Sequence, residues 1–280
     1  MNIIRLNSRD IKKLKEYKIH SDIDNSEATL YLYKDKLLKL FNSNSEEIVN
    51  NKMFILNKLF YVKDSVDIKE VVWPINLVSF GKRNKAYTME LIESNTNLSR
   101  IFNSNDVSLE DKIYFLKKIG YILRDLENNN ELMRIDFHLG DIHEGNFIYD
   151  NENNMVKVID IDSSYVSGAK ASRSKYLTFN DKLWDFPNKY PLDDNNKHIS
   201  SNNTTILSYF YMLLNLITEE YSPDFSTKVF CNVLNKLNDA GFNTELLDSI
   251  YNIYSLSDNY FDYDLLNSID SKLILKYREK

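Results

Sequence analysis

The spacing of apolar residues changes near residue 92, and this change constrains the fold more than any other feature of the sequence. Before it, apolar and polar residues often alternate, as in ATLYLYKDKLLKLF at residues 28–41, which is the period of β-strands. After it, apolar residues recur every three or four positions, which is the period of a helix with one buried face. We therefore expect a bilobal α+β protein, with a β-rich lobe at residues 1–90 and an α-rich lobe at residues 91–280.

The β-rich lobe is predicted to contain two pairs of strands. Residues 28–41 predict a β-hairpin whose turn lies at Lys34 and Asp35, two polar residues between apolar runs. Residues 71–80 and 85–92 predict a second pair of strands around a polar turn. One long helical pattern separates the two pairs, so this lobe is expected to be a sheet with one helix.

The α-rich lobe is predicted to begin with a helix and to contain a second hairpin. Ser108 and Asp111 have the spacing of residues that cap the start of a helix. A loop at residues 139–150 and a strand at residues 155–162 predict the hairpin. Helical patterns then return around residues 204–220, 224–240, 244–254 and 262–276.

Composition limits the partners and the surroundings that we expect. With 280 residues and a net charge of −6, the chain can bury a large core but has no general attraction for nucleic acid or for an anionic membrane surface. Its start has no signal-peptide pattern, and its most apolar stretch, residues 206–217, is too short to cross a bilayer. The single cysteine, Cys231, cannot form an internal disulfide and is expected to be a buried helix residue. We expect a cytoplasmic protein, and the sequence predicts no oligomeric state.

The residues that carry chemistry lie in the segment HLGDIHEGNFIYDNENNMVKVIDID, residues 138–162. Asp141 precedes Asn146 by five residues, and a short apolar strand places Asp160 fourteen residues after Asn146. Phosphoryl transfer needs one carboxylate that accepts the proton of the attacking hydroxyl, and an amide and a second carboxylate that hold magnesium. Asp141, Asn146 and Asp160 suit these roles in that order. The alternative is that they are a turn residue, a cap at the start of a strand and a surface carboxylate.

This segment resembles the catalytic loop and the metal-binding strand of the protein-kinase-like superfamily. Its GDIHEGN sequence is especially similar to the loop of aminoglycoside and choline kinases, which reads Gly-Asp-apolar-His-x-x-Asn. The resemblance covers residues 20–220. It implies a bilobal kinase fold, ATP and Mg²⁺ as cofactors, and transfer of the γ-phosphate of ATP to a hydroxyl group.

The resemblance also implies residues that bind the phosphates of ATP. Lys39 stands where kinases carry the lysine that contacts the α- and β-phosphates. The helix that follows should supply a glutamate to pair with Lys39, and only Glu46 and Glu47 are available in it. Because Glu46 is expected to form a capping box with Ser43, Glu47 is the predicted partner of Lys39.

The segment TMELIES, which starts at residue 88, resembles the connection between the two lobes of a kinase. The resemblance implies that Met89 closes the back of the nucleotide pocket. It also implies that the backbone from Glu90 to Ile92 hydrogen-bonds to adenine. Met89 is expected to be buried whether or not a nucleotide binds beside it.

Three features depart from conventional protein kinases. Residues 20–33 contain no glycine, although the glycine-rich phosphate loop should lie there, and Asn25 with Ser26 offers the alternative turn. Leu139-Gly140-Asp141 replaces His-Arg-Asp, so the arginine that would pair with a phosphorylated activation loop is missing. No Ala-Pro-Glu triplet follows, and residues 174–190 stand in the peptide-docking region. We therefore expect an activity that does not need activation-loop phosphorylation.

Two residues of the segment have more than one interpretation. His143 either assists catalysis, by donating a hydrogen bond or neutralising the transferred phosphate, or braces the loop. Asp162 either joins Asp160 in a metal site or caps the loop that follows it. His138 is expected to be structural.

The sequence favours an active kinase, because Lys39, Asp141, Asn146 and Asp160 are all present. We favour a serine or threonine hydroxyl of a protein as the acceptor, with a small-molecule hydroxyl as the alternative. A catalytically silent nucleotide-binding scaffold is the alternative of another class, since the glycine loop is missing. Nucleotidyl transfer by the same fold is a further possibility.

Overall fold

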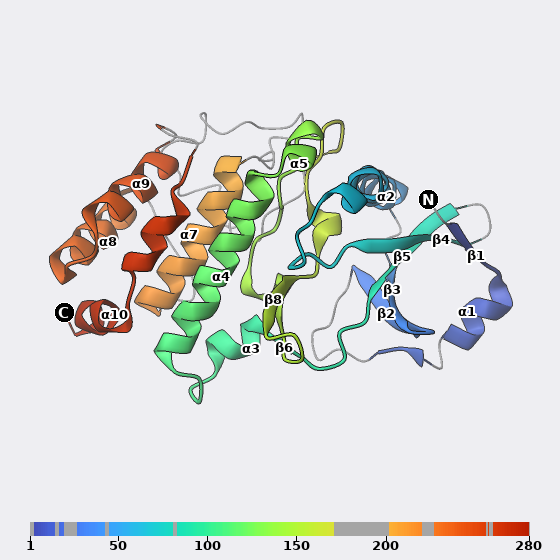
Figure 1. Ribbon diagram of the computed structural model, residues 1–280, viewed down its shortest axis with the longest axis horizontal. Coiled ribbons are helices and arrows are strands. Elements are labelled where there is room, and N and C mark those ends of the chain that lie inside the picture. The colour runs from blue at the N-terminus through green and yellow to red at the C-terminus, as the bar shows by residue number, and fades with distance from the viewer. Residues whose placement is uncertain are drawn as a thin grey trace.

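Figure 1 shows the computed structural model, in which residues 3–14, 17–19, 27–42, 45–80, 83–170, 202–219, 227–255, 257 and 260–279 are described. The protein has the predicted α+β class, with one five-stranded and one three-stranded sheet among its helices. Several helices gather at one end of the molecule and the larger sheet lies at the other (Figure 1). Two of the predictions lie outside the described residues: the turn at Asn25 and Ser26, and the segment 174–190.

The larger sheet contains both predicted pairs of strands. Its strands are β1 (Ile3–Leu6), β2 (Ala28–Tyr33), β3 (Lys36–Phe41), β4 (Pro74–Phe80) and β5 (Arg83–Glu90), in the order β1-β4-β5-β3-β2. The β2–β3 hairpin turns as predicted, and Lys34 in the turn has a positive φ of 58°. β1 pairs in parallel with β4, which the sequence did not predict.

The alternation of β3 gives its side chains two different surroundings. Leu38 joins a core cluster with Leu6 of β1 and Leu14 of helix α1 (Ser8–Leu14). Leu37 and Phe41 pack instead with residues of helix α2 (Glu46–Val62). Since side chains two apart on a strand share a face, Lys39 lies on the α2 side of the sheet.

Helix α2 packs on this face through an apolar stripe that includes Val49, Met53 and Leu56. Its N-cap is Ser45, whose side chain accepts a hydrogen bond from the Ile48 backbone N–H at 3.4 Å. The predicted capping box of Ser43 with Glu46 is therefore wrong, because the helix starts at Glu46 itself. Glu46 occupies the first turn, where a carboxylate interacts favourably with the helix dipole.

The smaller sheet contains the predicted second hairpin. Its strands are β6 (Asn95–Asn97), β7 (Phe147–Asp150) and β8 (Met155–Val158), in that order. The Val158 backbone also exchanges hydrogen bonds with the segment before β4, to the Glu70 carbonyl at 2.8 Å and from the Val72 N–H at 3.0 Å. These bonds fix the end of β8 beside the larger sheet.

The remaining helices surround the main core. They are α3 (Leu98–Asn103), α4 (Leu109–Glu127), α5 (Asn130–Arg134), α7 (Asn202–Thr218), α8 (Thr227–Ala240), α9 (Thr244–Tyr254) and α10 (Ser271–Arg278). The predicted caps at Ser108 and Asp111 are confirmed, with the Asp111 N–H donating to Ser108 Oγ at 3.0 Å. No described helix is long and apolar enough to cross a membrane.

Two predictions for this part of the chain need correction. The helix predicted around residues 262–276 is a 3₁₀ turn at Tyr263–Ser268 followed by α10. It is interrupted because the Asp270 side chain accepts a hydrogen bond from the Leu273 N–H at 2.9 Å, which starts a new helix. Cys231 of α8 is only partly buried.

Candidate active site

Lys39 meets two carboxylates that lie far along the chain from it. Its Nζ is 2.7 Å from Asp160 Oδ1 and 2.7 Å from Asp162 Oδ1. β8 ends at Val158, and the 3₁₀ turn at Ile161–Ser163 begins directly after Asp160. This sharp turn after the strand brings both carboxylates to one ammonium group.

Asp162 is the centre of the cluster and has no exposed surface. Lys52 Nζ of α2 is 2.8 Å from Asp162 Oδ2, and the Tyr87 hydroxyl of β5 donates to Oδ1 at 2.8 Å. Burial alone would raise the pKa of Asp162, yet Lys39 and Lys52 hold that pKa well below its ordinary value. A buried carboxylate is stable in the ionised form only when it is paired in this way.

Asp160 has a different environment from Asp162. Its side chain is 21% exposed, so it lies at the edge of the cluster. Burial, and then repulsion by the Asp162 carboxylate, raises the pKa of Asp160 to about 6, although Lys39 opposes this shift. Two neighbouring carboxylates with pKa values pushed in opposite directions are common at functional sites.

Lys52 is a cluster residue that the sequence analysis missed. It is only 9% exposed, and it also lies 3.2 Å from Ser163 Oγ and 3.3 Å from Glu27 Oε2. A signal was present in the sequence, because Lys52 is three residues after Val49 and four before Leu56, on the apolar face of the helix. A lysine in such a position is buried only with a partner.

The predicted pairing of Lys39 with Glu47 is wrong. Lys39 is held by Asp160 and Asp162, while the Glu47 side chain is 65% exposed and forms an ion pair with Lys170. The reason is helical geometry: Glu47 lies about 140° around the axis from Lys52, at 100° a residue, so the two cannot face the cluster together. The helix therefore supplies a cation to the cluster instead of an anion.

The loop before β7 holds Asp141 and Asn146 together. Asp141 has a positive φ of 51°, a strained conformation for a residue with a side chain. Asn146 Nδ2 donates to the Asp141 carbonyl at 2.9 Å, and the Asn146 carbonyl accepts from the Ile159 N–H at 3.0 Å. The second bond attaches the loop to the residue just before Asp160.

His143 and His138 make contacts that brace this region. His143 Nδ1 accepts a hydrogen bond from the Gly145 N–H at 3.1 Å, and its Nε2 lies 3.7 Å from Asp141 Oδ2. The first contact matches the interpretation of His143 as a loop brace, and a catalytic role for it stays a prediction. His138 Nε2 is 2.9 Å from Asp136 Oδ1, and its ring stacks on Tyr165.

Two of the residues predicted to surround adenine, Met89 and Ile92, lie on the α2 side of the larger sheet. Met89 is buried in the α2-side core, and Ile92 packs against that core. The Glu90 side chain accepts hydrogen bonds from Lys157 Nζ at 2.9 and 3.1 Å. The Ile92 carbonyl already accepts a hydrogen bond from Asn95 Nδ2, and contacts of this backbone with adenine stay a prediction.

Lys39, Lys52, Asn146 and Asp160 are residue types that can bind a magnesium nucleotide, and such binding stays a prediction. Asp160 and the amide oxygen of Asn146 are the oxygen ligands that Mg²⁺ takes in such sites, while the cluster lysines suit phosphate oxygens. The Asp162 carboxylate accepts contacts from Lys39, Lys52 and Tyr87, which does not match the alternative that it caps the following loop. Its role as a metal ligand stays a prediction. The described residues contain no group of three or more His, Cys, Asp or Glu side chains arranged to hold a metal.

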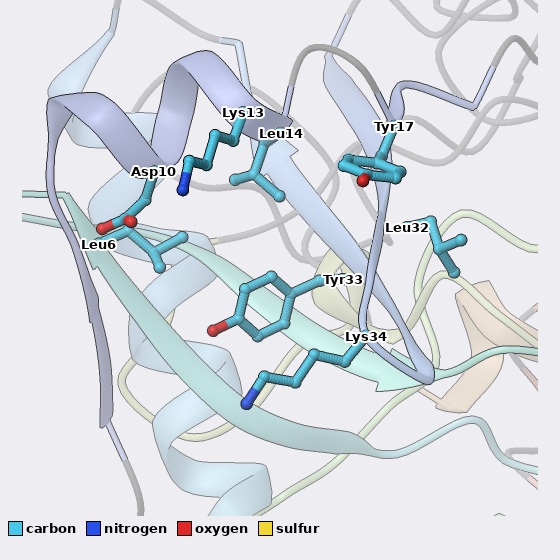
Figure 2. Close-up of a pocket in the computed structure, with 8 residues that line it drawn as sticks. All are labelled: Leu6, Asp10, Lys13, Leu14, Tyr17, Leu32, Tyr33 and Lys34. Carbon is cyan, nitrogen blue, oxygen red and sulfur yellow. The ribbon is translucent and has the colours of Figure 1, made fainter.

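A separate pocket of about 400 Å³ lies on the other face of the larger sheet, beside α1 (Figure 2). It is lined by Leu6, Asp10, Lys13, Leu14, Tyr17, Leu32, Tyr33 and Lys34. None of the predicted site residues lines this pocket. Leu38 packs with Leu6 and Leu14, which line the pocket, whereas the next residue, Lys39, points to the opposite face of the sheet.

The cluster of Lys39, Lys52, Asp160 and Asp162 thus combines two ammonium groups with one carboxylate at its solvent edge. The ammonium groups can hold an anion, and the edge carboxylate can hold a cation. No protein-family model matches the sequence, and a search of curated proteins found no match.

Proposed function

We propose that the protein is an ATP- and magnesium-dependent phosphotransferase with a bilobal protein-kinase-like fold. Its γ-phosphate acceptor is a serine or threonine hydroxyl of a protein. The observation that carries the proposal is the 2.7 Å contact between Lys39 and Asp160, residues that are 121 positions apart. A kinase needs this lysine and this carboxylate at one site, beside a loop that carries an aspartate and an asparagine.

The fold supports the same proposal. The five-stranded sheet with α2 supplies Lys39, Met89 and Glu90, and it corresponds to an N-terminal lobe at residues 1–90. The smaller sheet and the later helices supply Asp141, Asn146 and Asp160, and they correspond to a C-terminal lobe at residues 91–280.

Each residue then has a chemical task. Lys39 binds the α- and β-phosphates, and Asp160 with Asn146 binds magnesium. Asp141 accepts the proton of the acceptor hydroxyl, and His143 helps to orient the Asp141 carboxylate from 3.7 Å away. Magnesium ATP supplies the transferable phosphoryl group and the positive charge that neutralises it.

Two other functions are favoured by single observations. The GDIHEGN loop favours a small-molecule acceptor, since this sequence is similar to aminoglycoside and choline kinases. The absence of glycine from residues 20–33 favours a catalytically silent nucleotide-binding scaffold.

Labelled ATP separates these functions. The protein is incubated with magnesium and either γ- or α-labelled ATP, together with a general protein substrate or a panel of amino sugars and amino alcohols. Label from the γ position on protein supports the proposal, and label on a small molecule supports the first alternative. Label from the α position indicates nucleotidyl transfer, and binding of ATP without any transfer indicates the scaffold.

Matched variants identify the catalytic residue. Asp141→Asn is preferred to alanine because asparagine tolerates the positive φ at this position. It should lower turnover by about 100- to 10,000-fold while ATP affinity is kept, as expected for loss of a general base. Asp106→Asn, at an exposed carboxylate, is the control. Turnover of Asp141→Asn equal to that of wild type would show that Asp141 is not the base.

A further inference from the structure

The cluster contains one more cation than the proposed chemistry has used. Lys52 reaches it from the middle of α2, and its side chain is 11% exposed. Because kinases take an anion from the corresponding helix, the task of this buried lysine needs its own explanation.

Lys39 and Lys52 share one carboxylate. Lys39 Nζ contacts Asp162 Oδ1 and Lys52 Nζ contacts Asp162 Oδ2, so the two ammonium groups lie on adjacent sides of a single anion. Asp162 thus holds Lys39 together with Asp160, in place of the helix glutamate. A polyphosphate chain, which carries several anionic oxygens in a row, could contact both ammonium groups at once.

The surroundings of Lys52 point to the phosphate-binding region. Its Nζ lies 3.2 Å from Ser163 Oγ and 3.3 Å from Glu27 Oε2. Ser163 follows the predicted metal strand, and Glu27 is the residue just before β2. In a kinase the phosphates run between these two places, beneath the glycine-rich loop that this chain lacks.

We propose that Lys52 is a second phosphate-binding lysine, which together with Lys39 binds the polyphosphate of ATP where no glycine-rich loop is present. This inference rests on the proposed function. Backbone N–H groups of glycines normally hold the phosphates, and without glycines the backbone cannot come as close. A flexible side chain with three N–H donors performs the same task from a distance.

Glu27 occupies the position that a phosphate would take on Lys52. Its contact with Lys52 is the longest of the three, and its side chain is 70% exposed, so it can move into solvent. Since Glu27 is an anion that competes for the same ammonium group, removing its charge should favour phosphate. The substitutions Lys52→Met and Glu27→Gln are therefore expected to change ATP affinity in opposite directions.

The test compares the dissociation constants of ATP, ADP and AMP, all with magnesium, by competition with a fluorescent nucleotide. Lys52→Met should weaken ATP binding by roughly 10- to 100-fold, which is the loss of one charge-assisted contact, and AMP binding far less. Lys52→Arg should recover part of this loss, and Glu27→Gln should bind ATP more tightly than wild type. Lys58→Met is the control, because Lys58 is on the same helix and its ammonium lies over the Phe54 ring.

The outcomes separate this inference from the proposed function. If wild type binds none of the three nucleotides, the proposed function fails and this inference fails with it. If wild type binds ATP and Lys52→Met binds it equally well, or loses ATP and AMP to the same extent, only the inference is overturned. If Lys52→Met does not fold, Glu27→Gln and Lys52→Arg decide the question. The inference is overturned if the ratio of ATP affinity to AMP affinity in both of these variants is the same as in wild type.

Discussion

Asp162 shows how a single buried residue can organise a site. It has no exposed surface, and it accepts contacts from Lys39, Lys52 and Tyr87. Removing one member of a buried ion pair usually costs more than the pair contributes, because an uncompensated charge stays behind. Here the loss of Asp162 would leave two buried ammonium groups next to each other.

We therefore expect Asp162→Asn to lower the free energy of unfolding by about 3–5 kcal/mol. Denaturation by urea, followed by circular dichroism, measures this change. Asp106→Asn, at an exposed loop carboxylate, should change the unfolding free energy by less than about 0.5 kcal/mol. A loss at Asp162 no larger than that of the control would mean that the two lysines find other partners.

Residues differ in how far their roles can be predicted from sequence. Asp141, Asn146 and Asp160 were predicted as site residues because they belong to one short segment with fixed spacing, and their roles stay predictions. Lys52 was missed and Glu47 was wrongly paired because a side chain's partner, here 110 residues away, is set by the packing of α2 on the sheet. The local pattern of the helix indicates that Lys52 is buried, but it does not identify the partner of Lys52.

At the scale of elements, the β7–β8 hairpin positions Asn146 and Asp160, which flank it. Asp150 supports its turn by accepting the backbone N–H groups of Glu152 at 3.1 Å and Asn153 at 3.2 Å. Asn153 Nδ2 adds a bond at 2.8 Å, and Lys157 Nζ lies 3.3 Å away. Loss of this carboxylate should therefore loosen the hairpin.

The pH dependence of stability tests this role. Burial alone would raise the pKa of Asp150, but hydrogen bonds from Asn153 and the contact with Lys157 lower it below the ordinary 3.8. For a carboxyl with a lowered pKa, the stabilisation is complete above the unfolded value and is lost as pH falls through the folded one. Wild type should exceed Asp150→Asn in unfolding free energy by about 1–3 kcal/mol at pH 7, and the difference should shrink below pH 3.8. Unfolding by urea at a series of pH values measures it, and a difference that does not change with pH would contradict this role.

Elements were predicted well where their signals are local. Both hairpins follow from alternation and turn residues, and α4 follows from its apolar period and its cap at Ser108. β1 was missed because it has only four residues, Ile3–Leu6, and pairs with β4 more than sixty residues later. The N-cap of α2 was predicted at Ser43 but is Ser45. Two serines stand just before the helix, and their spacing in the sequence alone does not show which of them is the cap.

At the scale of the whole molecule, α2 is attached to the segment that follows β8. Beyond the Lys52–Asp162 contact, Asn51 Nδ2 donates to the Lys170 carbonyl at 3.0 Å, and the Lys170 N–H donates to Asn51 Oδ1 at 2.7 Å. Under the proposed function, α2 corresponds to the helix that a phosphorylated loop brings into place in regulated kinases. These contacts attach α2 to the segment after β8 through a buried ion pair and two hydrogen bonds.

Under the proposed function, we expect phosphatase treatment to leave turnover within about twofold of the untreated protein, since α2 is already held by its contacts with Asp162 and Lys170. Mass spectrometry of the protein before and after treatment verifies that any phosphate has been removed. A large loss of turnover after treatment would show that a phosphorylated residue is required after all.

Binding of magnesium ATP should stabilise the whole molecule, because the ligand binds the folded state and not the unfolded one. At a concentration about 100 times its dissociation constant, ATP should add about 2.7 kcal/mol, which raises the Tm by roughly 5 °C in a protein of this size. Differential scanning fluorimetry with and without EDTA measures how much of this rise depends on the metal.

Asp160→Asn should lose the metal-dependent part of the rise in Tm, since Asp160 is a proposed magnesium ligand at the edge of the cluster. Asp141→Asn should keep it, since the proposed role of Asp141 is to act on the acceptor hydroxyl and not on the metal. Equal rises in Tm for wild type and both variants would show that the nucleotide binds away from the cluster, for example in the pocket beside α1.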